Sequence, residues 1–369
     1  MIVGEIQTPA GLIHKVATRL NVNDRFGAIK VRWLISRNNY KVEPGLYAAG
    51  NPTDASDVFV TANYKLSFDH LRKNLDGMDA WIMVLDTKGV NVWCAAGKGT
   101  FGTQELINRI RTTQLEKIIS HRKIIIPQLG ATGISAWQVK KYTTPAKPSL
   151  AIQTNPTQSS ISVDNGLKPE KGFQVVFGPV RAADIRDFIA NRYQTTPAMR
   201  KVHFNFYDRL KLTPVDLVYA RYKLLAAFAV IIILSGLNHT GISFKQAIEK
   251  GLPALLNITL AYFTGILVTP LLLPYIPFRM FAAKGLITGI ILSAILYFSG
   301  LLGHTSIEIV SWLLILSGIS SFMAMNFTGA STFTSLSGVK KEMKVFVPVQ
   351  VVFASAGIIL LVINNLTNY

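Results

Sequence analysis

Five long stretches without a charged side chain fill the second half of this 369-residue chain, and they constrain its fold more than any other feature. Each is at least as long as the ~20 residues with which an α-helix crosses a bilayer. We therefore expect five transmembrane helices, the second shortened by prolines to Ala254–Leu273 and the fourth ending near Phe327. The stretches without Asp, Glu, Lys or Arg are residues 224–244, 251–278, 285–307, 309–339 and 345–369.

The charged loops between these stretches predict how the chain crosses the membrane. Basic residues are concentrated before the first stretch and in the segments 279–284 and 340–344, whereas the opposite loops hold only Lys245 and Lys250. Because loops rich in Lys and Arg stay in the cytoplasm, we expect a multi-pass protein of the cytoplasmic membrane with its C-terminus outside. Residues 1–26 lack the unbroken apolar core of a secretory signal, so we expect the N-terminal half in the cytoplasm.

Ionisable side chains are almost absent from the five predicted spans. His304 and Glu308 are the exceptions, and both lie near the end of a span. Transport paths usually contain acidic or basic residues in mid-membrane. An anchor is therefore the favoured interpretation of this half of the chain.

The first half of the chain alternates short apolar runs with amphipathic segments. We expect strands at residues 29–35, 58–60, 81–85, 123–126 and 173–177. Helical segments are expected at residues 68–75, 103–119, 134–142 and 184–193. This alternation favours an α/β domain with a mostly parallel sheet and helices on its faces. Thr143–Lys171 is rich in Thr, Pro, Ser, Asn and Gln, and we expect it to be a loop within that domain.

These patterns predict three regions. Residues 1–195 form the α/β domain, 196–222 a basic juxtamembrane linker, and 223–369 the transmembrane domain. The linker interleaves Arg and Lys with aromatic residues, a composition that suits the surface of a membrane. A solvated linker is the alternative interpretation.

The chain has a single cysteine, Cys94, directly after the apolar run Trp81–Leu85 and a short turn. One cysteine excludes an intramolecular disulfide and an iron–sulfur cluster held by this chain alone. Asn91 is a good N-cap, which places Cys94 at the third position of a one-turn helix, where the helix dipole and backbone N–H groups favour a thiolate. Gly97 and Gly99 keep the neighbouring surface free of side chains, so a flat ligand has room to approach.

Several roles for this thiol stay open at this point. A lone cysteine is often a small buried hydrophobic residue. A cysteine nucleophile needs a positioned base, and the sequence suggests no histidine for that role. A closed zinc site needs three more ligands, and no suitable spacing exists. The remaining possibility is a single axial ligand to a metal that brings its own equatorial ligands, such as a haem or a corrinoid.

The run Gly97–Gly102 matches the dinucleotide pattern GxGxxG only weakly. Its first glycine does not follow a strand directly, and the downstream region offers only Glu116 as an acidic partner. A phosphate-binding loop is also excluded, because Lys98 is followed by Gly99 instead of Ser or Thr.

Four segments of the first half resemble a known family of corrinoid proteins. They are VTANYKLSFD (60–69), NVWCAAGKGTFGT (91–103), PQLGATG (127–133) and FGPVRAADI (177–185). The motif around the cysteine closely resembles the corrinoid protein of microbial mercury methylation, the HgcA family. The wider run is similar to the corrinoid domain of the corrinoid iron–sulfur protein of the acetyl-CoA pathway. Cysteine at position 94 and the five spans point to the mercury-methylating branch, because the acetyl-CoA pathway protein is soluble.

The resemblance implies a Rossmann-like corrinoid-binding domain followed by an all-α transmembrane domain of five helices. It implies a cobalamin-type corrinoid bound base-off, with the Cys94 thiolate as the lower axial ligand of cobalt. By resemblance, the protein is a corrinoid-dependent methyltransferase component that transfers a methyl group from Co(III) to Hg(II) and forms methylmercury. The residues expected to bind the cofactor are Thr61, Ser67, Asn91, Val92, Trp93, Cys94, Ala95, Gly97 and Lys98.

The resemblance also implies partners. Electrons for cobalt are expected from a ferredoxin-like protein with two 4Fe–4S clusters, and the methyl group from a methyl-pterin-dependent methyltransferase. Hg(II) and the membrane are the other expected partners, and no nucleic acid is expected. Two other functions remain open: a membrane-anchored methyl carrier of one-carbon metabolism, and a transporter with a regulatory nucleotide-binding domain.

Overall fold

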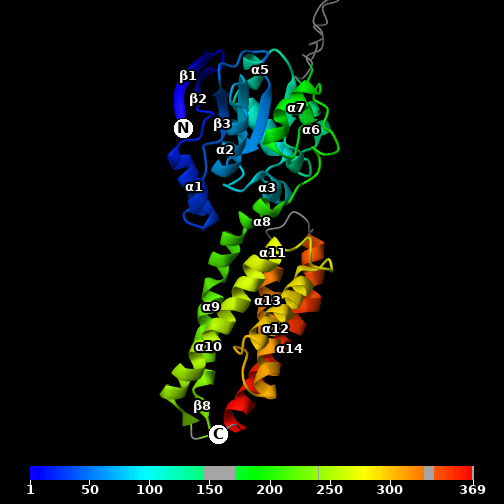
Figure 1. The fold of residues 1–369 in the computed structure, drawn as a ribbon. Coiled ribbons are helices and arrows are strands. Elements are labelled where there is room, and N and C mark those ends of the chain that lie inside the picture. The colour runs from blue at the N-terminus through cyan, green and yellow to red at the C-terminus, as the bar shows by residue number, and fades with distance from the viewer. Residues whose placement is uncertain (145–170, 240, 328–335, 368–369) are drawn as a thin grey trace, which may run out of the picture. The chain divides into compact units, whose positions relative to one another are not determined.

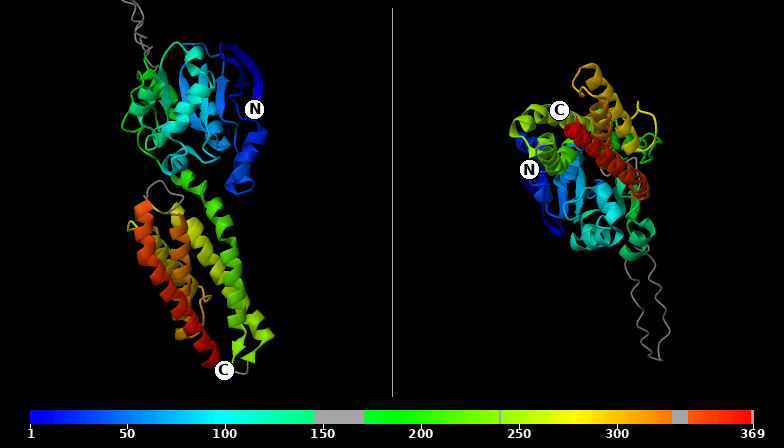
Figure 2. Two further views of the ribbon diagram at one scale, coloured as in Figure 1. Left: turned by 180° about the vertical axis from the view of Figure 1, so that it is seen from behind. Right: turned by 90° about the horizontal axis from the view of Figure 1, so that it is seen from below.

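A computed structural model describes residues 1–144, 171–239, 241–327 and 336–367 of the chain (Figures 1 and 2). The chain divides into two compact units, one of residues 1–31 and 35–202, the other of residues 32–34 and 203–369. Most of the expected loop Thr143–Lys171 lies outside the described residues. The expected linker 196–222 contains helix α8 (Phe206–Leu210) and the first turns of α9 (Thr213–Ser235).

The first unit is built on a seven-stranded mixed sheet in the order β1-β2-β3-β5-β4-β6-β7. Its parallel part is β5-β4-β6-β7, whereas β3 is antiparallel to β5 and β1 is antiparallel to β2. The α/β fold class is therefore confirmed, with antiparallel pairs at one side of the sheet. The strands are Ile2–Thr8 (β1), Gly11–Val16 (β2), Gly45–Ala49 (β3), Val58–Ala62 (β4), Ala80–Leu85 (β5), Lys123–Ile126 (β6) and Gln174–Phe177 (β7).

Helices cover both faces of this sheet (Figure 2). Successive side chains of a strand point to opposite faces, and β5 shows the consequence. Trp81 and Met83 pack in one apolar cluster with Leu106, while Ile82 packs in the other with Phe68. On the first face lie α3 (Val92–Lys98), α4 (Thr103–Thr112), α5 (Leu115–Ile118) and α6 (Ala136–Thr143); on the second lie α2 (Lys65–Asn74) and α7 (Ile185–Ala190).

The strand expected at residues 29–35 is wrong, because this segment continues helix α1 (Val22–Arg32). The backbone N–H of Asp24 donates to Asn21 Oδ1 at 2.8 Å, and the N–H of Asn21 donates to Asp24 Oδ2 at 3.1 Å. This reciprocal pair caps the helix in the manner of a capping box. The alternation of residues 29–35 therefore marks a mostly exposed helix.

The helix expected over residues 103–119 is broken in two. Gln114 adopts a left-handed backbone conformation with φ 48°, which ends α4 and allows α5 to begin. The inward residues expected from the helical spacing are nevertheless buried. They are Leu106, Ile110, Leu115 and Ile118.

Among its described residues, the second unit contains five helices that are long and apolar enough to cross a membrane. Figure 1 shows them packed side by side. The helical stretches are Phe206–Ser235, Phe244–Leu271, Phe281–Phe298, Ser306–Asn326 and Ser337–Thr367. The second begins ten residues before the expected Ala254, because α10 (Phe244–Phe263) accommodates Pro253 in its interior. It continues through η4 (Thr264–Val268) into α11 (Thr269–Leu271).

The remaining elements of this unit are α12 (Phe281–Phe298), α13 (Ser306–Asn326), α14 (Leu336–Thr367) and the hairpin of β8 (Leu237–Asn238) with β9 (Gly241–Ile242). Small and hydroxylated residues hold the helices together, as is usual within membranes. The hydroxyl of Thr288 on α12 lies 2.7 Å from that of Thr269 and 3.2 Å from that of Ser320 on α13. These contacts satisfy polar groups inside the bundle.

Candidate functional site

The order of the parallel strands places a switch point between β4 and β6. The chain runs from β4 to β5 on one side, and then returns past β4 to β6 on the other. Connections that leave a sheet in opposite directions open a crevice at the carboxyl ends of the strands, where ligands of open α/β sheets bind. The strands β4, β5, β6 and β7 all end at this edge, because each is parallel to its neighbour.

A cleft of about 250 Å³ lies at this switch point. Its walls are largely apolar and come from both neighbours of the switch, Phe59 of β4 and Ile125 of β6, and from Pro127 and Pro179 beyond the strand ends. An apolar cleft with a few polar groups is the usual form of a small-molecule site. The polar residues along its wall are Thr61, Ser67, His70 and Asn91.

Helix α3 begins at the wall of this cleft. Asn91 Oδ1 accepts a hydrogen bond from the backbone N–H of Cys94 at 2.9 Å, so Asn91 is the N-cap and Cys94 the third residue of the helix, as expected. The helix has seven residues and ends at Gly99, whose φ of 80° suits a left-handed C-cap. It is therefore longer than the single turn expected from sequence.

Helix α3 has one face buried in the core and one face that is partly exposed. Val92, Ala95 and Ala96 pack into the apolar core, which anchors the helix against the sheet. Cys94 is half-buried, and its neighbour Trp93 lines the cleft. A side chain at Gly97 would meet nothing within 4 Å, so the surface beyond the thiol is open.

The structure brings five of the nine expected cofactor-binding residues to the cleft. These are Thr61, Ser67, Asn91, Val92 and Trp93. Cys94 directly follows them in the chain and lies outside the cleft lining. Ala95 is fully buried in the core, whereas Gly97 and Lys98 are exposed at the end of α3. In the part of the chain that the structure describes, no group of three or more His, Cys, Asp or Glu side chains is arranged to hold a metal ion.

Several lining residues were not identified from sequence. Pro127 follows β6, and Gly178 and Pro179 follow β7. Their position in the sequence could have identified them as lining residues. A Pro or Gly directly after a buried strand indicates the carboxyl edge of the sheet, where ligands bind. His70 also lines the cleft, from the exposed side of α2.

The glycine run connects two helices, and it does not follow a strand. Gly99 ends α3, and Gly102 is the N-cap of α4. A side chain at Gly102 would lie 2.7 Å from the carbonyl oxygen of Gly99. Close passage of the backbone therefore explains this glycine without a bound phosphate.

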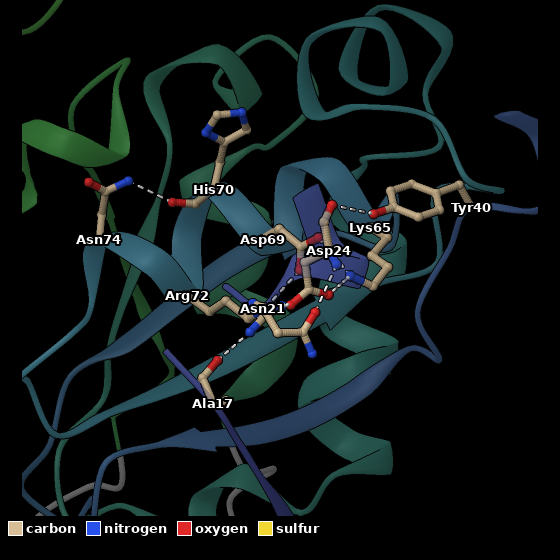
Figure 3. Close-up of polar contacts among 9 residues, drawn as sticks. All are labelled: Ala17, Asn21, Asp24, Tyr40, Lys65, Asp69, His70, Arg72 and Asn74. Carbon is tan, nitrogen blue, oxygen red and sulfur yellow. Dashed lines mark hydrogen bonds and ion pairs between the residues drawn. The ribbon is translucent and has the colours of Figure 1, made fainter. Parts of the chain in front are cut away.

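A buried ionic cluster fixes helix α2, which carries Ser67 and His70 to the cleft (Figure 3). Lys65 Nζ lies 2.6 Å from Asp24 Oδ1 and 2.7 Å from Asp69 Oδ2. Arg72 is fully buried and lies 2.7 Å from both carboxylates through Nη2 and Nε. Because Asp24 belongs to α1 and the other three to α2, the cluster joins the two helices.

Electrostatics within the cluster favour the charged forms. Burial of Asp24 opposes its ionisation, but hydrogen bonds from Lys65 and Arg72 outweigh burial and lower the pKa of Asp24 from 3.8 to about 2. Burial likewise opposes the charge on Lys65, and its hydrogen bonds to Asp24 and Asp69 outweigh this and raise its pKa. Figure 3 shows the same side chains linked to Asn21 and Ala17, so the cluster also ties α2 to the end of β2.

Residues 35–144 match the sequence model of the family described as the CO dehydrogenase/acetyl-CoA synthase delta subunit. The chain is also similar to acetyl-CoA decarbonylase/synthase complex subunits gamma. Identity is 33% over 97 residues in Archaeoglobus fulgidus, 34% over 97 in Methanopyrus kandleri and 35% over 98 in Methanocaldococcus jannaschii. Each similarity covers 26% of this chain, and the chain spans only 20–21% of the length of these relatives. The family match includes β4 to β6 and helix α3, and it ends before the unit of five long apolar helices.

Proposed function

We propose that this chain is a membrane-anchored corrinoid protein that carries a methyl group and delivers it to Hg(II), with Cys94 as the lower ligand of cobalt. The observation that carries the proposal is the position of α3. Its N-terminus forms a wall of the cleft at the switch point, within the segment that matches the delta-subunit family. The only cysteine of the chain lies on that helix.

The residues at the cleft fit a corrinoid. A corrinoid supplies a cobalt atom that accepts a methyl group and gives it up again. The apolar walls around Phe59 and Ile125 exclude water from one side of a large flat ligand. Thr61, Ser67 and Asn91 offer hydroxyl and amide groups for its polar edge. The open surface at Gly97 and Gly99 leaves room for a macrocycle to approach the thiol.

Cys94 then has a chemical role. A thiolate is a soft, electron-rich ligand that donates electron density to the metal that it binds, as it does in haem enzymes. Such donation favours release of a methyl group to an electrophile, and Hg(II) is a soft electrophile. We propose that Thr61, Ser67, the Asn91–Trp93 backbone, Ala95, Gly97 and Lys98 position the cofactor around this thiolate.

The composition of the chain supports a need for partners. With a single cysteine it holds no iron–sulfur cluster of its own. We propose that a ferredoxin-like protein with two 4Fe–4S clusters supplies electrons, and that a methyl-pterin-dependent methyltransferase supplies the methyl group. The five apolar helices anchor this chemistry at the cytoplasmic membrane, with the N-terminal unit in the cytoplasm.

A second candidate is a methyl carrier of one-carbon metabolism that does not act on mercury. The similarity to acetyl-CoA decarbonylase/synthase subunits favours it. The two candidates share the cofactor and differ in the acceptor of the methyl group.

The test compares the full chain with Cys94→Ala after purification in detergent with a bound corrinoid. We expect both proteins to retain the cofactor, because the cleft is intact, but to differ in the absorption bands that report the lower ligand of cobalt. Cells that produce Cys94→Ala together with the partners should form no methylmercury above the background of cells lacking this chain. Glu116→Gln, an exposed change on α5, is the matched control and should behave as wild type.

Unchanged absorption bands in Cys94→Ala would contradict the ligand role. Methylmercury formation at the wild-type rate would contradict it as well. A wild-type protein that binds and accepts methyl groups but never forms methylmercury from Hg(II) would favour the second candidate.

A further inference from the structure

A stripe of large apolar side chains runs along the exposed side of helix α1. Val22, Phe26 and Ile29 belong to the helix, and Trp33 directly follows it. The exposed fractions of these four residues lie between 43% and 65%. They align on one face, because residues three and four positions apart are neighbours on the surface of a helix. We call these four residues the apolar stripe.

The opposite face of α1 attaches the helix to the first unit. Val31 is 1% exposed and Asp24 is 6% exposed. Asp24 is also paired with Lys65 and Arg72 of α2. The fold therefore uses one side of α1 for its own core, and the apolar stripe on the other side is not needed for that packing. Four aligned apolar residues on a surface are typical of an interaction site.

Cationic side chains border the apolar stripe. Arg25 precedes Phe26, Lys30 follows Ile29, and both Arg25 and Lys30 are exposed. Because a helix turns by about 100° per residue, these two cations lie on opposite borders of the stripe. The only acidic residue of α1 is Asp24, which is buried. The exposed side of α1 therefore combines apolar groups with positive charge and carries no acidic side chain.

This combination indicates what the apolar stripe contacts. Helices that lie in the surface of a membrane have an apolar face with Trp, Phe or Leu and a polar face rich in Lys and Arg. Tryptophan is also enriched at membrane interfaces, and Trp33 is at the end of the stripe. A symmetric contact between two copies of the chain would bring their Arg25 and Lys30 side chains together. An anionic lipid surface neutralises these charges instead.

The connection between the two units supports this assignment. The first unit ends at residue 202, and the first long apolar helical stretch begins at Phe206. Three residues of extended chain reach only about 10 Å. Such a short tether keeps the first unit within reach of a membrane that this helix crosses, and it raises the effective concentration of lipid at α1.

We propose that the apolar stripe of α1 docks on the anionic surface of the membrane that holds the five apolar helices. Its four side chains enter the head-group region, while Arg25 and Lys30 approach the lipid phosphates. Because Asp24 joins α1 to α2 through Lys65 and Arg72, the docked helix also fixes the orientation of the cleft. The inference rests on the proposed membrane anchoring, and it does not depend on which ligand the cleft binds.

The experiment places an environment-sensitive fluorophore on the apolar stripe of the full chain. In a Cys94→Ser background, Ile29→Cys carries the label, and the protein is reconstituted into vesicles of phosphatidylcholine and phosphatidylglycerol. We expect lipids with a nitroxide at the head group to quench this label. Glu116→Cys is the matched control, because it is exposed on α5, at the end of the first unit opposite to α1 (Figure 1). A label there should not be quenched.

A second set of variants tests the role of charge. Each Lys or Arg near an anionic surface changes the ratio of docked to undocked helix by about fivefold. Arg25→Gln combined with Lys30→Gln should therefore lower this ratio by roughly 25-fold, and quenching should need a higher content of phosphatidylglycerol. Lys117→Gln removes an exposed cation of α5 and should leave the quenching unchanged.

The possible failures are distinguishable. Protein that does not float with the vesicles would contradict the membrane anchoring, and with it the docking of α1. Protein that floats, but whose label at Ile29→Cys is not quenched, would refute the docking alone. A shift of the emission to shorter wavelength without quenching would show that protein covers the stripe instead of lipid. Quenching that is equal with and without Arg25 and Lys30 would overturn the assignment to an anionic surface.

Discussion

At the scale of single residues, the cluster of Asp24, Lys65, Asp69 and Arg72 holds the helix that carries part of the cleft wall. Removing one member leaves one of the remaining buried charges uncompensated, which is more costly than never having built the cluster. The geometry of the cleft therefore depends on side chains that do not line it. We expect these four side chains to contribute to the stability of the folded chain and to the dependence of that stability on pH.

The pH dependence follows from Asp24. Its pKa is about 2 in the folded chain against 3.8 for the unperturbed group, so the ionised carboxylate stabilises the fold at pH values above 3.8. This contribution, about 2 kcal/mol, is lost as the pH falls from about 4 through 2. We expect the melting temperature of the wild type, followed by circular dichroism in detergent, to fall steeply over this interval.

Asp24→Asn should be less stable near neutral pH by about 3 kcal/mol and should lose most of this steep phase. Asp54→Asn, at an exposed position, is the matched control. An identical pH profile for Asp24→Asn and the wild type would show that Asp24 does not carry the effect.

Two residue pairs show which features of the site could be predicted from the amino-acid sequence. The cap of α3 depends on Asn91 and Cys94, three positions apart, and such a local rule is visible in the sequence. Asp24 and Lys65 are 41 positions apart and meet only because α1 and α2 pack together. The residues next to Asp24 or Lys65 in the sequence give no indication of a partner 41 positions away.

At the scale of elements, burial decides what could be predicted. The strands β4, β5 and β6 are covered by helices on both faces, so they appear in the sequence as unbroken apolar runs. Strand β1 is mostly exposed and lacks such a run, and it was not predicted. Helix α1 resembles a strand in the sequence because large apolar residues occupy exposed positions. Phe26 and Ile29 on the helix, and Trp33 just after it, are exposed and hide the amphipathic pattern.

The contact between α12 and α13 gives a prediction about packing. A side chain at Gly289 would lie 2.6 Å from the Cα atom of Ser317, a backbone atom that moves only with its whole helix. We expect Gly289→Val to separate the helices and to destabilise the membrane unit by about 1–3 kcal/mol or more. The measurement is the melting temperature of the detergent-solubilised protein, together with its elution as a monodisperse species.

Gly251→Ala is the matched control on α10. A methyl group there would have its closest neighbours at 3.8 and 3.9 Å, which is ordinary contact, and alanine favours the helix. We expect this variant to be as stable as the wild type or slightly more stable. Equal stability of Gly289→Val and Gly251→Ala would contradict the close packing of α12 on α13.

At the scale of the whole molecule, the two units differ in the kinds of contact that hold them together. The first unit has ionic clusters and a mixed sheet, and the second has five apolar helices joined by small and hydroxylated residues. The number of long apolar helices among the described residues was predictable, because absence of charge over 20 or more residues is a strong signal. A cavity that Asn257 lines was not predictable, since its lining residues come from four helices and a loop that meet only in the folded bundle.

Five membrane-spanning helices would place the two ends of the chain on opposite sides of the membrane, and the loop charges predict which end is inside. In a Cys94→Ser background, the variants Tyr275→Cys and Ser299→Cys each introduce one exposed thiol, in the two connections on either side of α12. Arg279 and Lys284 next to the first connection are retained, because they contribute to the orientation. We expect a membrane-impermeant maleimide to label Ser299→Cys in intact spheroplasts, and Tyr275→Cys only after the membrane is permeabilised. The reverse pattern would place the first unit outside, where cytoplasmic electron and methyl donors could not reach the proposed corrinoid site.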